Sequence, residues 1–225
     1  MEPAIDEINE SKARNMLYAM GVNENDETSA IFVSKNKVAD VCSKYIKEQL
    51  VLVTENGKVV KQLNRKEYMA ENNIQEPYLI DVKKLQSLEK EGKQRKLPLF
   101  VGEKEGNTLY IAPIRGKGLW DAIWGYVAMD KNMVVQGVYF DHKGETPGLG
   151  ANIKQRFFMD DFTGEQMMHN DAFKGIQVAK GNNDPKNIDK TDNEVDAIAG
   201  ATITGDGVSA MIKSELKNTY HSLTL

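Results

Sequence analysis

Three glycine-bearing loops carry the residue types best suited to holding a ligand, and they cover residues 115–120, 144–150 and 199–207. The third loop leads into a predicted helix. Small residues there let backbone N–H groups approach a phosphate, whose negative charge the helix dipole favours. The glycine spacing does not match the dinucleotide fingerprint, and no Gly-Lys-Ser/Thr closes a Walker loop. The alternative interpretation is a tight turn and a helix N-cap at Thr204 or Asp206.

The other two loops each have a plain and a functional interpretation. Within residues 144–150, Pro147-Gly148 is a common turn dipeptide. Three glycines of that loop would also admit a flat ligand close to the backbone: Gly144, Gly148 and Gly150. The segment Gly116-Lys117-Gly118 reads most simply as a flexible turn before a strand. Trp120 and Trp124 are interpreted as core aromatics, and His142 as a solvated loop residue.

Composition argues against several cofactors and partners. Cys42 is the only cysteine and the three histidines lie far apart, so the sequence predicts no internal disulfide, iron–sulfur cluster or other metal site. The net charge of −4 gives no electrostatic reason to bind nucleic acid. No apolar run approaches the ~20 residues that span a bilayer, and the start shows no signal-peptide pattern. Any redox chemistry would therefore need an organic cofactor.

The elements that must position these loops begin with helices. Apolar residues at helical spacing predict a helix over residues 4–21 and a second over 29–50. The period then changes, and Glu55-Asn56-Gly57 between two valine-rich runs predicts a hairpin. Residues 61–97 are highly charged and are interpreted as loop and short helix.

From residue 98 the pattern is that of an antiparallel sheet. Two hairpins are predicted, one turning at Gly106-Asn107 and one at residues 130–132. A short strand over 175–179, a polar stretch over 181–196 and a last helix over 207–223 follow. The fold class is therefore α+β, with a central antiparallel sheet and helices at both ends. We divide the chain into residues 1–97, packed on the same domain, and residues 98–225.

The segment Asp196-Ala197-Ile198-Ala199-Gly200-Ala201-Thr202 resembles the flavinylation motif Asp-x-x-Ser/Thr-Gly-Ala-Thr of FMN-binding domains. Ala199 departs from that pattern. The segment Gly116-Lys117-Gly118-Leu119-Trp120, the loop 144–150 and the opening helix are similar to the family of FMN-binding subunits of Na⁺-translocating NADH:quinone reductases. The likeness extends, in order, over nearly the whole chain.

This resemblance implies an FMN held covalently, through a phosphoester, by the hydroxyl of Thr202. A separate flavin transferase would form that bond from FAD, since a threonine hydroxyl is a poor nucleophile unaided. The resemblance also implies the residues around the cofactor, with no catalytic group among them. They are Gly200, Ala201, Ile203 and Thr204 beside the attachment point, Glu145, Thr146, Gly148, Leu149 and Gly150 along the ring, and Trp120 at its edge.

The resemblance further implies partners and a location. The chain would relay electrons among the other subunits of a membrane-bound complex whose activity as a whole is coupled to sodium translocation. An anchor helix before residue 1 would hold it on the periplasmic side of a bacterial inner membrane. Two alternatives stay open: the flavoprotein subunit of the related ferredoxin:NAD oxidoreductase complex, and a flavin-free assembly module.

Overall fold

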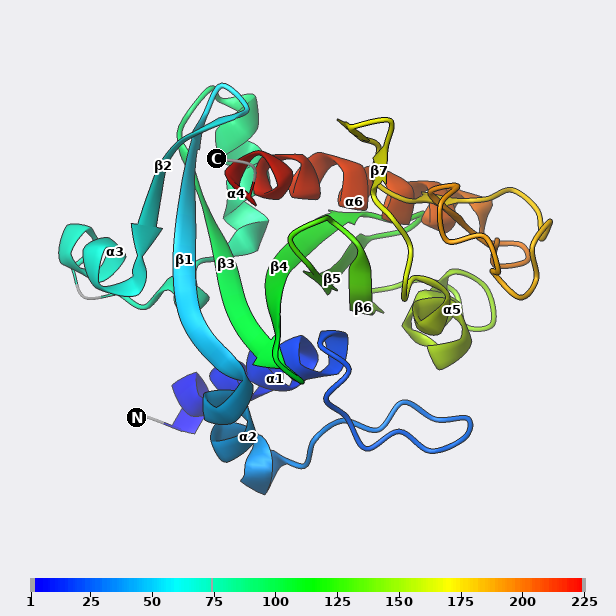
Figure 1. Ribbon diagram of the computed structural model, residues 1–225, viewed down its shortest axis with the longest axis horizontal. Coiled ribbons are helices and arrows are strands. Elements are labelled where there is room, and N and C mark those ends of the chain that lie inside the picture. Colours follow the sequence, from blue (N-terminus) through cyan, green and yellow to red (C-terminus); the bar gives the residue numbers. More distant parts are fainter. Residues whose placement is uncertain (1–2, 74, 224–225) are drawn as a thin grey trace.

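The computed structural model describes residues 3–73 and 75–223 and folds them around a six-stranded antiparallel sheet (Figure 1). The strand order is β2-β1-β3-β4-β5-β6. The strands are β1 (Ile46–Glu55), β2 (Lys58–Asn64), β3 (Arg95–Lys104), β4 (Asn107–Lys117), β5 (Ala122–Met129) and β6 (Val135–His142). Helix α1 (Pro3–Ala19) opens the chain and α6 (Thr202–Leu223) closes it. The predicted α+β class, with a central antiparallel sheet and helices at both ends, is confirmed.

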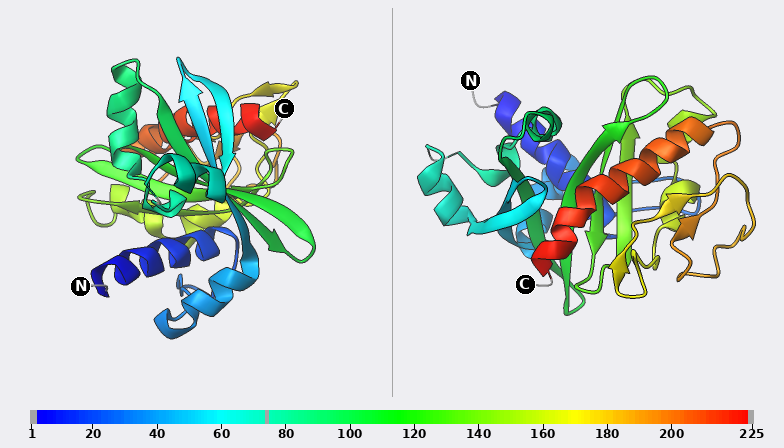
Figure 2. Two further views of the ribbon diagram at one scale, coloured as in Figure 1. Left: turned by 90° about the vertical axis from the view of Figure 1, so that its left-hand side faces the viewer. Right: turned by 90° about the horizontal axis from the view of Figure 1, so that it is seen from above.

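The two terminal helices cover opposite faces of the sheet (Figure 2). Glycines allow both helices to approach closely. A Cβ atom on Gly137 of β6 would lie 2.4 Å from the carbonyl oxygen of Ala19, at the end of α1. A Cβ on Gly116 of β4 would lie 2.8 Å from the Cβ of Met211 in α6. The sheet is thus buried between helices, and its largest fully buried side chains include Phe140, Leu99 and Ile123.

The predicted hairpins are present, with one shift. Asn56 and Gly57 have φ values of 51° and 71°, and they join β1 to β2 as predicted. The second turn is formed by Glu105 and Gly106, one residue earlier than predicted, with φ values of 53° and 77°. Asn107 instead begins β4 and pairs with Lys104.

The helix predicted over residues 29–50 is wrong in length. A 3₁₀ turn (Lys35–Lys37) and α2 (Val38–Tyr45) are its only helical parts. Strand β1 starts at Ile46 because it pairs with β3 on one side and with β2 on the other, and Leu50 lies opposite Leu99. Such pairing over a long strand outweighs local helical periodicity.

The segment between the hairpin and the sheet contains short helices, as predicted. They are α3 (Arg65–Glu71), a 3₁₀ turn (Pro77–Leu79) and α4 (Val82–Lys90). After β6 come a 3₁₀ turn (Gly150–Lys154) and α5 (Arg156–Asp161). The predicted strand near residue 177 is only β9 (Gln177–Val178), which pairs in parallel with β10 (Glu194–Val195) outside the main sheet. A separate small hairpin joins β7 (Met168–His169) to β8 (Ala172–Phe173).

Helix α6 begins at Thr202, five residues before its predicted start. The prediction treated Gly205 and Gly207 as loop residues because glycine is a poor helix former. Gly207 lies inside the helix, where a Cβ atom would be 2.3 Å from the carbonyl oxygen of Lys117. Close packing of α6 on the end of β4 therefore accounts for that glycine.

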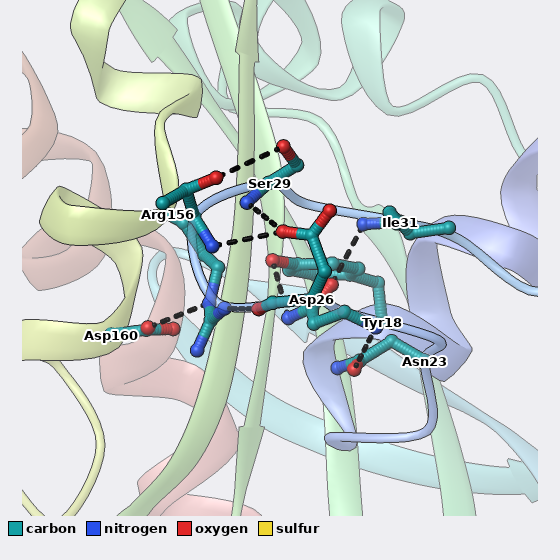
Figure 3. Close-up of polar contacts among 9 residues, drawn as sticks. Tyr18, Asn23, Asp26, Ser29, Ile31, Arg156 and Asp160 are labelled. Atoms are coloured by element: carbon teal, nitrogen blue, oxygen red, sulfur yellow. Dashed lines mark hydrogen bonds and ion pairs between the residues drawn. The ribbon is translucent and has the colours of Figure 1, made fainter.

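The amino-terminal region also contacts the carboxy-terminal half through a polar cluster (Figure 3). Arg156 of α5 donates hydrogen bonds to the carbonyl oxygen of Asp26 and to the carboxylate of Asp160. The Asp26 side chain accepts from the Ser29 N–H at 2.6 Å and so shapes its own loop. The loop thereby ties the segment after α1 to α5. Among the described residues, no helix is long and apolar enough to cross a membrane.

Candidate functional site

The three glycine-bearing loops lie together at one end of the sheet. The register Gly116↔Ile123↔His142 places the turn between β4 and β5 beside the end of β6. The first turns of α6 cover the same place, because Gly207 packs against Lys117. Segments that are up to 90 residues apart in the sequence (116 to 206) therefore form one site.

The carboxylate of Glu145 joins the three loops. Its Oε1 accepts hydrogen bonds from the N–H groups of Trp120 (2.9 Å) and Asp121 (3.4 Å). Its Oε2 accepts from the Leu119 N–H (3.3 Å) and the Thr204 hydroxyl (2.5 Å). Burial acts to raise the pKa of Glu145, but the bonds from Thr204 and the three amides outweigh it, and the net pKa lies below its ordinary value. The group is therefore an anion at neutral pH.

The two threonines at the start of α6 differ in accessibility. Thr202 and Ile203 are exposed, whereas Thr204 is only 1% exposed and its hydroxyl is bonded to Glu145. The first N–H groups of a helix have no partner within the helix, and its N-terminus favours negative charge. Thr202 is thus an accessible hydroxyl at a terminus suited to a phosphate.

Exposed apolar side chains gather around Thr202. Eight large apolar residues are exposed in the described part of the chain, and four of them belong to these three segments. They are Leu119 (41% exposed), Trp120 (65%), Leu149 (41%) and Ile203 (58%). Such clustering marks a surface suited to a ligand or partner, since monomeric proteins rarely expose large apolar patches.

The loop after β6 is a turn that leaves open space in front of its backbone. Leu149 N–H and Ala151 N–H both donate to the carbonyl oxygen of Thr146, at 3.1 Å each. Gly148 has a φ of +77°, and a Cβ there would meet no heavy atom within 4 Å. Thr146 is fixed by the Trp120 indole, whose Nε1 donates to its hydroxyl at 3.1 Å. The loop is therefore a turn and also an open face.

Several interpretations of single residues are corrected by the structure. Trp120 is not a core aromatic, because the turn between β4 and β5 carries its ring outward, and Trp124 is only half-buried. His142 is half-buried at the end of β6, where its Nδ1 accepts from the Glu145 N–H at 3.2 Å. The proposed N-cap at Thr204 or Asp206 is wrong, because the helix has already begun at Thr202.

Sequence reasoning missed residues whose role depends on contacts with distant segments. A Cβ on Gly118 would lie 2.6 Å from Glu145 Oε1, and a Cβ on Gly150 would lie 2.6 Å from Glu145 Oε2. Both glycines thus make room for the carboxylate. Leu119 lies in a segment that the sequence singled out, but its exposed side chain and its bond to Glu145 have no signal of their own. All eleven predicted cofactor residues lie in these converging loops.

Similarity to known proteins is concentrated in the part of the chain that forms this site. Residues 118–217 match the model of the FMN-binding domain family, and this stretch contains most of the three converging segments. The chain belongs to the FMN-binding domain family. Within that family the chain is similar to the NqrC proteins of Na⁺-translocating NADH-quinone reductases, which confirms the resemblance.

The similar proteins cover different parts of the chain. NqrC from Pseudomonas aeruginosa is 32% identical over 123 residues, which are 53% of this chain and 46% of that protein. NqrC from Yersinia pestis is 37% identical over 103 residues, 44% and 36% of the two chains. The crystal structure of NqrC from Parabacteroides distasonis superposes with a TM-score of 0.73 and 26% identity, over 99% of this chain and 96% of that one. The chain thus spans about half or less of the length of these two curated relatives, whereas its fold matches the crystal structure throughout.

Proposed function

We propose that this FMN-binding domain carries FMN covalently on Thr202 and relays electrons within a membrane-bound NADH:quinone reductase. The observation that carries the proposal is the position of Thr202. Its hydroxyl is exposed at the first position of a 22-residue helix, at the end of a segment that matches the flavinylation motif in all but Ala199. That hydroxyl is the acceptor the motif requires, and Ala199 does not replace it.

The residues at the site fit the two parts of FMN. Backbone N–H groups in the first turn of α6, from Thr202 to Thr204, would hold the phosphate. Leu119, Leu149, Ile203 and the Trp120 ring would cover the flat ring system, with Thr146 available to its polar edge. FMN, when bound, supplies the one- and two-electron chemistry that the side chains lack.

Attachment would make Thr202 the nucleophile. Its Oγ1 loses the hydroxyl proton to a base of the transferase and bonds to the phosphorus of the flavin half of FAD. The bond between the two phosphates breaks and AMP leaves. The domain brings no base of its own to Thr202 in its described contacts, which is consistent with a separate flavin transferase as the partner.

Covalent attachment suits an exposed site. The apolar side chains that surround Thr202 lie on the surface, so a dissociable flavin would be lost readily, whereas a tethered one stays. The same exposure would let other subunits approach the cofactor. We place the domain on the periplasmic side of a bacterial inner membrane, joined to it by an anchor helix before residue 1, within a complex that couples electron transfer to sodium translocation.

Two other functions compete with this one. The flavoprotein subunit of the ferredoxin:NAD oxidoreductase complex would use the same acceptor motif. The amino-terminal region and the segment Gly116-Lys117-Gly118-Leu119-Trp120 favour the reductase. A flavin-free assembly module would have no reason to expose a threonine hydroxyl beside four apolar side chains.

The test is the intact mass of the domain after coexpression with a flavin transferase. The parent should gain the mass of one FMN and stay yellow after denaturation. Thr202→Ala should give colourless protein of unmodified mass, and Thr204→Ala is the comparison at the neighbouring hydroxyl. If Thr202→Ala still gains FMN while Thr204→Ala does not, the acceptor is misassigned; a parent that never gains FMN refutes the function.

A further inference from the structure

Glu145 has a role that its inclusion among the ring-lining residues does not explain. Its carboxylate is 4% exposed, and all of its hydrogen bonds go to the protein itself: to the N–H groups of residues 119–121 and to the hydroxyl of Thr204. Its own N–H is in turn bonded to His142. The side chain therefore points into the junction of the loops and away from the exposed apolar surface.

The space around the carboxylate is built to fit it. Gly118 and Gly150 approach from two loops, and a Cβ on either would lie 2.6 Å from a carboxylate oxygen. A Cβ on Gly150 would also lie 2.5 Å from the Thr204 hydroxyl. The positions of the carboxylate and of Thr204 are thus fixed together, with little room for another arrangement.

The bond to Thr204 controls how α6 starts. Successive helical residues are turned by about 100°, so Thr202 and Thr204 project about 200° apart around the helix axis. Holding Thr204 toward the buried carboxylate therefore turns Thr202 outward. The same bond occupies the hydroxyl of Thr204, which would otherwise be a second acceptor two residues away.

We propose that Glu145 is the positioning residue for flavin attachment: by binding the Thr204 hydroxyl it fixes the rotation of the first turn of α6 and so presents Thr202 alone to the transferase. This inference rests on the proposed function. It assigns Glu145 to the maturation of the site, and Thr204 to its support in place of contact with FMN.

The test measures the rate of FMN attachment to purified, folded domain by a fixed amount of transferase and FAD. Thr204→Val keeps the shape of the side chain and removes only the hydroxyl, whereas Thr204→Ser keeps the hydroxyl. We expect Thr204→Val and Glu145→Gln to slow attachment on the order of tenfold or more, because misplacing a reacting atom by about 1 Å has effects of that size. Thr204→Ser should restore most of the rate. Glu165→Gln, which alters a buried carboxylate outside these loops, is the control.

Thermal unfolding separates positioning from loss of folding. A variant that unfolds cooperatively near the parental temperature and yet attaches FMN slowly supports the role of Glu145. If Glu145→Gln does not fold, the comparison of Thr204→Val with Thr204→Ser decides. Equal rates for those two variants would overturn the inference. Failure of the parent to gain FMN on the peptide containing Thr202 would instead refute the proposed function.

Discussion

At the scale of single residues, Gly148 tests whether the loop after β6 lines the flavin. Gly148→Val puts a side chain into space that is open in this structure, at a φ of +77°. Gly106 is a matched control, because it has the same φ, also has no neighbour within 4 Å of a Cβ, and lies in the turn between β3 and β4. We expect each variant to lose about 1–2 kcal/mol of stability from backbone strain.

Only Gly148→Val should alter the flavin. A branched side chain at that position would push the ring from the loop and expose it to water, and would thereby change its midpoint potential and fluorescence. Both properties are measured on the flavinylated variants together with their thermal unfolding. Should Gly148→Val match Gly106→Val in both, this loop would have to be removed from the site.

Glu165 makes stability depend on pH. It is completely buried, and burial raises the pKa of its carboxyl group to about 7, although Lys190 at 3.4 Å partly offsets this. Because its pKa in the folded state lies above that in the unfolded chain, the unfolded chain ionises first. Stability therefore falls as pH rises from about 4.5 to 7 and stays reduced above that range.

Replacing this carboxyl group should reverse that dependence. Glu165→Gln should be more stable than the parent at pH 8, by about 1–3 kcal/mol, and the difference should shrink toward pH 5. Urea unfolding at several pH values measures it. Glu71→Gln, which removes a carboxylate from an exposed ion pair with Lys61, should show no such trend. A constant difference between parent and Glu165→Gln would exclude the assigned titration.

At the scale of elements, the packing of α6 on β4 positions the acceptor. Gly207→Ala would place a methyl group 2.3 Å from the backbone oxygen of Lys117, which cannot move without shifting the end of β4. We expect a loss of about 1–3 kcal/mol, which exceeds the gain in helix propensity from replacing glycine. In Gly205→Ala the new methyl group would meet only the side chain of Val178 at 3.0 Å, so the loss should be smaller.

Chemical denaturation of Gly207→Ala and Gly205→Ala compares the two glycines. Equal losses would mean that the start of α6 adapts freely and that its contact with β4 does not fix the site. A larger loss in Gly207→Ala, accompanied by slower flavin attachment, is the expected outcome.

At the scale of the whole molecule, the division at residue 97 is a boundary between regions that share one sheet. Strand β1 pairs with β3 from Ile46 to Thr54, and α1 covers the sheet face that includes Gly137. A chain of residues 98–225 alone would lack β1, β2 and α1, and would expose the apolar edge of β3. We expect it to lose cooperative thermal unfolding, measured by circular dichroism against the full chain; a cooperative transition near the parental temperature would make 98–225 an independent domain.

The sequence by itself determined the features that depend on neighbouring residues. Asn56-Gly57 predicts its turn because both positions need a positive φ, and alternating apolar residues predict the hairpins of β3 to β6. The motif ending at Thr202 predicts the acceptor, because its residues are contiguous. The tertiary structure alone decided what depends on distant segments. Pairing with β3 took residues 46–50 into a strand, and packing on Lys117 placed Gly207 inside a helix. It also brought Glu145 to Thr204 across 59 residues, a contact that no local pattern encodes because it exists only when β4, β6 and α6 have met.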